Sequence, residues 1–178
     1  MAKEISLRVF NQRLAERLRV AQAEAAPASR LGVETAGARW LLRLEDAGEV
    51  LPVPRLWSVP LTQPWFLGIA NIRGNLASVV DFSAFMGGQP TPLTPESRLV
   101  LLAERFRAAS ALVVSRLLGL KYLQQMTPLA TGTGAGGASD WPWLGPAYRD
   151  QGDGGVREWR ELDIAALTTQ ESFLQVGL

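Results

Sequence analysis

The chain has 178 residues, of which 47% are hydrophobic and 20% charged, and its formal net charge is +1. This length and apolar content are enough for one globular domain with a full core, and they exclude a mainly disordered chain. The sequence contains no cysteine and no histidine. Disulfides, thiolate metal sites, thiol nucleophiles and the commonest acid–base side chain are therefore excluded. We expect a soluble, cytoplasmic protein, because the N-terminus lacks a signal-peptide core and no apolar run is long enough to span a membrane.

The first thirty residues differ from the rest. From Ile5 to about Ala25, apolar residues recur every three or four positions, which predicts an amphipathic helix; they are Leu7, Phe10, Leu14, Leu18, Ala21 and Ala25. Residues 1–30 hold six Lys or Arg and three acids, so the other face is basic. The helix either packs on its own domain or docks on an acidic partner or a membrane surface. Pro27 ends it, and we assign residues 1–30 to this helix and a linker and residues 31–178 to the main domain.

The main domain is expected to be mainly β, with short strands and Gly/Pro turns. Hairpins are predicted for three pairs of apolar runs, 39–45 with 49–53, 98–103 with 109–115, and 141–149 with 156–162. Residues 116–124 fit either a strand or a helix. The prolines between Pro52 and Pro64 favour an edge strand or an irregular crossing. Asp163 can cap a last helix, from Ile164 to about Val176.

The most informative stretch runs from Gly68 to Gly87. Two β-prone runs, 69–72 and 76–82, flank Arg73-Gly74-Asn75, a connector typical of a tight hairpin. Both faces of the second run are at least half apolar, so we expect this strand to lie between two packed layers. An Arg in a tight turn can pair with a carboxylate at an interface, or it can simply be solvated.

The same stretch contains a motif of fixed spacing, Gly68-x-x-Asn71-x-Arg73-Gly74, followed by Asp81 in Val-Val-Asp-Phe and preceded by Pro60 and Pro64-Trp65-Phe66-Leu67. It resembles the CheW-like chemotaxis coupling proteins, and its residue pattern is most similar to that of members that serve type IV pilus (twitching) chemosensory systems. The resemblance covers about residues 40–167. It implies two small SH3-like five-stranded β-barrels packed through a shared core, roughly residues 36–86 plus the C-terminal region, and the span between.

This resemblance implies a non-catalytic adaptor in a chemosensory pathway that controls twitching motility. One barrel surface would bind the regulatory domain of a CheA-like histidine kinase, and a groove near the Asn71-x-Arg73-Gly74 turn would bind the tip of a methyl-accepting chemoreceptor. Arg73 is the main predicted contact. Family members often pair the matching Arg with an acid in a V-x-E-I motif of the preceding strand. This chain has Leu51-Pro52-Val53-Pro54 there, so we expect Arg73 to lack an internal partner.

Other residues of the motif have predicted roles of their own. We expect Asn71, Gly68 and Gly74 to form the turn, and Asp81 to accept hydrogen bonds from neighbouring backbone donors. Aromatic residues near turns are candidates for partner contacts, although core packing is the alternative for each; they are Trp57, Trp65, Phe66, Trp141 and Trp143.

No activated nucleophile or carboxylate pair is visible, so we predict no catalytic residue, cofactor or metal site. Gly132-x-Gly134-x-x-Gly137 matches a dinucleotide-binding fingerprint, but no helix follows it, and we expect a loop over residues 127–137. The Gly-rich segment 150–155 lacks the calcium-loop ligand pattern. The alternative function is nucleic-acid binding by a small β-barrel. The twelve basic and fourteen acidic residues beyond residue 30 argue against it.

Overall fold

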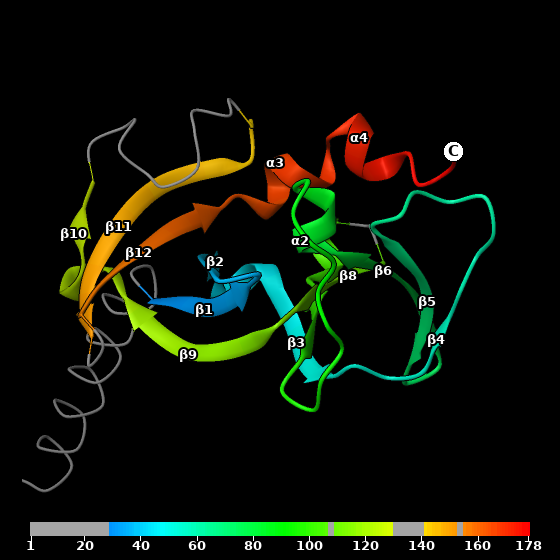
Figure 1. The fold of residues 1–178 in the computed structure, drawn as a ribbon, viewed down its shortest axis with the longest axis horizontal. Helices are drawn as coiled ribbons and strands as arrows, with labels where there is room; N and C mark the ends of the chain where they lie inside the picture. Colours follow the sequence, from blue (N-terminus) through cyan, green and yellow to red (C-terminus); the bar gives the residue numbers. More distant parts are fainter. Residues whose placement is uncertain (1–28, 107–108, 130–140, 153–154) are drawn as a thin grey trace, which may run out of the picture.

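The protein is described by a computed structural model over residues 29–106, 109–129, 141–152 and 155–178. The N-terminal helix and the Gly132–Gly137 motif therefore lie outside the described residues. The strands form two six-stranded sheets side by side (Figure 1). We call them sheet A, in the order β10-β11-β12-β2-β1-β9, and sheet B, in the order β3-β7-β8-β6-β5-β4. The prediction of a mainly β domain is confirmed.

Sheet A combines strands from both ends of the domain, and sheet B uses the middle of the chain. Sheet A contains β1 (Ser29–Thr35), β2 (Ala38–Arg43), β9 (Arg116–Tyr122), β10 (Thr127–Pro128), β11 (Leu144–Gly152) and β12 (Gly155–Leu162). Sheet B contains β3 (Ala47–Pro52), β4 (Leu56–Trp57), β5 (Phe66–Ile72), β6 (Asn75–Asp81), β7 (Arg98–Leu102) and β8 (Ser110–Val114). Short helices lie between strands and at the C-terminal end: η2 (Leu44–Asp46), α2 (Phe82–Phe85), η3 (Glu104–Phe106), η4 (Leu123–Gln125), α3 (Ile164–Thr168) and α4 (Glu171–Leu174).

The expected hairpin between residues 39–45 and 49–53 is wrong. β2 pairs with β1 and β12 in sheet A, whereas β3 pairs with β7 in sheet B. The intervening η2 carries the chain from one sheet to the other. It is anchored to sheet B, because the Asp46 carbonyl accepts the Ala103 N–H at 2.9 Å and the Asp46 carboxylate pairs with Arg105. The expected division near residues 36–86 is therefore wrong too, since that span contributes to both sheets.

Several local predictions are confirmed. β7 pairs antiparallel with β8, and β11 pairs antiparallel with β12, as the hairpin patterns indicated. Residues 116–122 form a strand rather than a helix. The Pro-rich stretch contains only the two-residue β4, at the edge of sheet B. Each sheet has six strands rather than five, and the end strands of each order do not pair with one another in the described residues, so the closed barrels stay a prediction.

The C-terminal helix is shorter and broken. Asp163 caps α3 as predicted, with its carboxylate accepting the Ala166 N–H at 2.9 Å. The helix ends because Gln170 has an extended backbone, and α4 begins after it. Thr168 and Thr169 donate their hydroxyls back to helix carbonyls, which favours an end at this point. The break turns Phe173 into the core.

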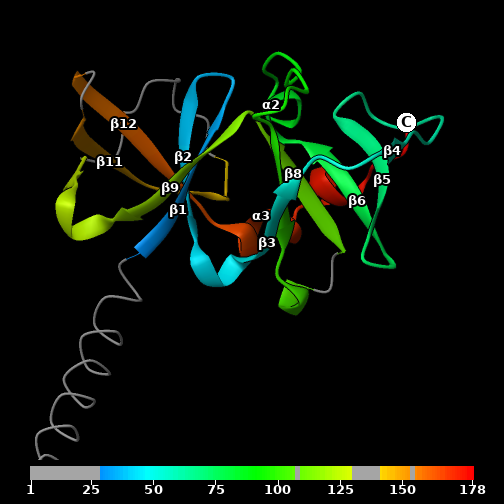
Figure 2. The ribbon, with the colours of Figure 1, turned by 90° about the horizontal axis from the view of Figure 1, so that it is seen from below.

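The main hydrophobic core lies between the two sheets, which Figure 2 shows side by side with α3 between them. β6 contributes to it through Val80, while Val79 and Ala77 on the other face belong to a second cluster within sheet B. This confirms that β6 lies between two packed layers. A third cluster, around Leu41, Met126 and Trp159, lies on the face of sheet A that is turned away from the main core.

Candidate partner-binding site

The β5–β6 turn has the backbone that its sequence requires. Arg73 and Gly74 occupy a two-residue connection in which both have positive φ, 53° and 91°. This pair of conformations matches the twist of the flanking strands in a hairpin. The Asn71 side-chain oxygen accepts the Gly74 N–H at 2.8 Å. The predicted roles of Asn71 and Gly74 in the turn are confirmed.

Gly68 has a different role from the one predicted. It lies at a register shift between Phe66 and Gly68, away from the turn, and its φ is +120°. A Cβ at this position would stand 2.1 Å from the Trp57 carbonyl oxygen. Glycine is therefore needed so that the chain of β4 can approach β5 closely.

Arg73 has an internal partner, which corrects the sequence-based expectation. Its Nη2 donates to Glu49 Oε1 at 2.7 Å, and the two side chains are 78% and 31% exposed. The acid lies in β3, two residues before the Leu51–Pro54 segment that stands in place of the V-x-E-I motif. An exposed pair of this kind contributes about 0.2–1 kcal/mol. A carboxylate from another protein could therefore replace Glu49 at little cost.

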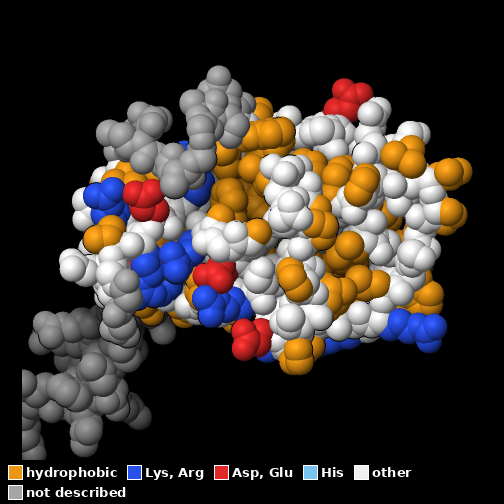
Figure 3. Space-filling view, in the orientation of Figure 1, with side chains coloured by type: hydrophobic (Ala, Val, Ile, Leu, Met, Phe, Trp, Pro, Cys, Tyr) orange, Lys and Arg blue, Asp and Glu red, His pale blue; other side chains and the backbone are white. Residues whose placement is uncertain are grey.

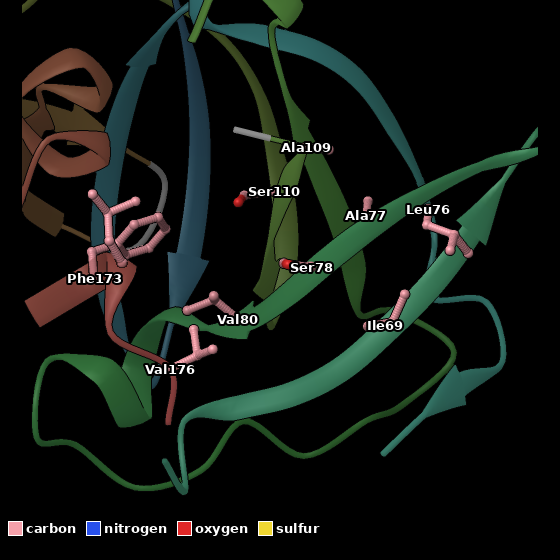
Figure 4. Close-up of a pocket in the computed structure, with 10 residues that line it drawn as sticks. Ile69, Leu76, Ala77, Ser78, Val80, Ala109, Ser110, Phe173 and Val176 are labelled. Atoms are coloured by element: carbon pink, nitrogen blue, oxygen red, sulfur yellow. The ribbon is translucent and has the colours of Figure 1, made fainter. Parts of the chain in front are cut away.

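The turn borders a groove along β6. One hollow, of about 540 Å³, includes Arg73 and Glu49, and a second, of about 320 Å³, lies toward the C-terminal segment. They share Leu76, Ala77 and Ala109. In Figure 4, Phe173 and Val176 lie near Val80 at one end of the second hollow, and Ile69 and Leu76 lie at the other. We call the two hollows together the β6 groove. Its lining is mainly apolar, with an ion pair at one end.

Asp81 holds the end of β6 in place. Its buried carboxylate accepts the N–H groups of Ser83 and Ala84, which caps α2. It also accepts the Thr91 N–H at 2.6 Å and the Thr91 hydroxyl at 2.7 Å. The predicted role of Asp81 as an acceptor for neighbouring backbone donors is confirmed.

The predicted contact aromatics divide into core and surface residues. Phe66 and Trp143 are buried in the main core, and Trp65 packs against it, stacking on Phe173 with ring centroids 6.5 Å apart. Trp65 and Phe66 are therefore core residues rather than surface contacts. Trp57 and Trp141 are exposed.

A second surface was largely missed by sequence reasoning. Three residues of the segment that follows Arg55 expose large apolar side chains, Trp57, Val59 and Leu61. The C-terminal segment adds Leu178, whose N–H donates to the Leu61 carbonyl at 3.1 Å. Leu61 and Leu178 are 80% and 83% exposed. We call these four side chains the apolar ridge.

Two features make the ridge unusual. Leu61 has a φ of 60°, a left-handed conformation that costs a leucine about 1–2 kcal/mol. Arg55 is the only charged residue between positions 52 and 72, and its guanidinium lies 5.9 Å from the centre of the Trp57 ring. Charged side chains gather mainly over the sheet A half of the face in Figure 3, and apolar ones over the sheet B half. The alternation at 57, 59 and 61 without charges was the available signal.

These features define a mainly β domain, with an apolar groove along β6 and an apolar ridge beside β4. A model of the CheW-like domain family matches residues 30–171, and the chain belongs to this family. It is 28% identical to Protein PilI of Pseudomonas aeruginosa over 174 residues, which is 94% of this chain and 90% of that protein. The crystal structure of the scaffolding protein TtCheW from Thermoanaerobacter tengcongensis matches with a TM-score of 0.56 at 15% identity, over 78% of this chain and 91% of that one.

Two kinds of feature are absent from the described residues. No group of three or more acidic, His or Cys side chains is placed there to hold a metal ion. No helix in the described part of the chain has the length and apolarity needed to cross a membrane.

Proposed function

We propose that the protein is a non-catalytic adaptor that couples methyl-accepting chemoreceptors to a CheA-like histidine kinase in a pathway that controls twitching motility. Membership of the CheW-like family and similarity to PilI support this proposal. The structural observation that carries it is the presence of two apolar surfaces at sheet B, the β6 groove and the apolar ridge, which adjoin where Trp57 pairs with Ile69. An adaptor needs two such surfaces in order to hold two partners at once.

The β6 groove is the proposed receptor site. A concave apolar surface accepts the apolar face of a helix, and an ion pair at its end can fix the register. Arg73 would exchange Glu49 for a receptor carboxylate, since its guanidinium is 78% exposed and presents several donors. Leu76, 64% exposed between the two hollows, would be buried by the helix.

The apolar ridge is the proposed kinase site. Monomeric proteins rarely leave clustered large apolar side chains in water unless a partner covers them. The strained Leu61 sharpens this argument, because its backbone conformation holds the side chain outward at a cost to stability. Aromatic residues such as Trp57 often dominate binding energy when they lie at the centre of an interface.

Calorimetry with the regulatory domain of the kinase and with a receptor-tip fragment tests the proposal. Leu61→Asn should weaken kinase binding by about tenfold or more while leaving receptor binding unchanged. It should also raise the free energy of unfolding by about 1 kcal/mol, because Asn tolerates the left-handed conformation better. Arg73→Glu should weaken receptor binding and spare the kinase.

A matched control is Val156→Asn, which replaces an exposed apolar residue of sheet A and should change neither affinity. If the folded Leu61→Asn and Arg73→Glu variants bound both partners normally, the two assignments would be wrong. Salt dependence tests the alternative of nucleic-acid binding: affinity for an oligonucleotide that falls steeply with salt would favour it. Kinase binding that survives moderate salt would favour the adaptor.

A further inference from the structure

Within the described part of the chain, β9 leaves an apolar strip exposed at the edge of sheet A. It is the last strand in the order of that sheet and pairs with β1 on one side. Three of its residues are large, apolar and substantially exposed: Leu117 is 40% exposed, Leu120 is 52% exposed and Tyr122 is 39% exposed. In Figure 1 this strand runs along the lower edge of the sheet. Exposed apolar edge strands are normally covered, because they invite unwanted pairing.

A bulge in β9 brings the three side chains to one face. Opposite residues of a pair point to the same side, and the register places Leu117 opposite Val33 and Leu120 opposite Leu31. The register shifts between Gly32 and Val33, where β9 contains an extra residue beside Gly119, which has a φ of 78°. Without the bulge, the side chains of Leu117 and Leu120 would lie on opposite faces of the sheet.

The strip is therefore an extension of the main core. Val33 and Leu31 are buried in that core, and Tyr122 lies opposite the buried Ser29. Leu118, on the other face of β9, packs against the third cluster within sheet A. A surface that continues the core beyond the sheet edge suits a helix that packs on the same face.

We propose that the chain's own residues 5–25, as an amphipathic helix, cover this strip. The preceding chain enters β1 at Ser29, directly opposite Tyr122, and only residues 26–28 separate it from the predicted helix. Three residues reach at most about 10 Å, so the C-terminal end of the helix must lie beside the strip. Leu7 to Leu18 spans about 17 Å along a helix. Leu117 to Tyr122 spans about 17 Å along a strand.

The occupant also fits by chemistry. The helix presents leucines and Phe10 on one side, which matches the aliphatic and aromatic strip. Its arginines lie around the rest of the helix and would stay in water, beside a sheet whose surface already mixes both charges. This resolves the two open interpretations of the N-terminal segment in favour of packing on its own domain.

Hydrogen exchange of the intact chain tests the proposal. Amides of residues 5–25 should exchange at least about tenfold more slowly than expected for an unfolded chain. The double variant Leu117→Ser/Leu120→Ser should abolish most of this slowing. The matched control Leu93→Ser/Val156→Ser, which removes two exposed apolar residues elsewhere, should preserve it. In the reciprocal variant Leu14→Ser/Leu18→Ser, exchange within residues 116–122 should become faster while the domain stays folded.

Three results would overturn the proposal. Unprotected exchange across residues 5–25 would mean that the segment does not dock, and slowing that survives Leu117→Ser/Leu120→Ser would place it elsewhere. Slowing that appears only with a dimeric mass, or only with anionic vesicles, would assign the helix to a second copy or to a membrane. No partner protein is used in these measurements, so their failure would leave the adaptor function intact.

Discussion

Sheet A and sheet B handle their charged residues differently. Across sheet A, basic side chains pair with acids on neighbouring or nearby strands, and the pairs include Arg30 with Glu161, Arg116 with Glu34, and Arg149 with Glu158. In sheet B, the exposed Arg73–Glu49 pair lies beside a groove, and most other strand positions are apolar. Sheet A thus pairs many of its charged side chains internally, whereas sheet B leaves apolar surface and one weak ion pair available to partners.

The two sheets also differ in the interactions that fix the register of their strands. Opposite charges facing one another across strands favour one register in sheet A. Sheet B lacks such pairs along its interior strands and depends on apolar alternation and on glycine at close approaches. Substitutions should therefore lower the free energy of unfolding for different reasons in the two sheets.

The largest effect is expected at Gly68. In Gly68→Val the new side chain would collide with the backbone at Trp57 and adopt an unfavourable φ of +120°. We expect the free energy of unfolding in urea to fall by about 3 kcal/mol or more, with loss of the ridge. Gly74→Ala is the control, since it has a positive φ but no atom within 4 Å of a new Cβ, and it should cost about 1 kcal/mol. Equal losses would show that crowding by β4 does not matter.

A smaller effect is expected from the buried acid of sheet A. Glu161 is 8% exposed at its side chain and accepts from Arg30 Nε and Nη2, each at 2.9 Å, with Arg43 Nε 3.6 Å away. Glu161→Ala leaves buried positive charge poorly compensated, so we expect a loss of about 2–3 kcal/mol in the free energy of unfolding. Glu158→Ala, which removes a more exposed pair, should cost about 0.5 kcal/mol or less. Similar losses for both would contradict a special role for burial.

Prediction from sequence succeeded where neighbouring residues determine the structure. The β5–β6 hairpin was readable because Asn71, Arg73 and Gly74 carry the turn chemistry within four positions. The path from β2 to β3 was not, because β2 pairs with β1 and β12 in one sheet, β3 pairs with β7 in the other, and the connector between them resembles a hairpin loop.

The same distinction applies to the candidate site. Glu49 and Arg73 meet only because β3 and the β5–β6 hairpin lie in one sheet, which no local pattern reveals. The ridge likewise depends on tertiary contacts that hold Leu61 in a strained conformation and bring the C-terminal segment beside it. The motif was enough to locate the β5–β6 turn. The residues that contact it, such as Glu49, are apparent only in the folded structure.

The smallest effect on the free energy of unfolding is expected at Asp46, which lies at the junction of the two sheets. Burial raises the pKa of this carboxyl above its ordinary value of 3.8, although the nearby Arg105 acts in the opposite direction. A raised pKa means that the folded protein binds this proton more tightly than the unfolded chain does, so the carboxyl lowers stability once it ionises. As the pH rises from about 3 to about 7, Asp46→Asn should gain stability relative to the original protein.

Urea unfolding of both proteins across this pH range measures the trend, and the other acids largely cancel in the comparison because both chains share them. The opposite trend would mean that the pairing with Arg105 outweighs burial, and that the junction resembles the ion pairs of sheet A. The expected trend would place Asp46 with sheet B, where burial rather than charge pairing dominates.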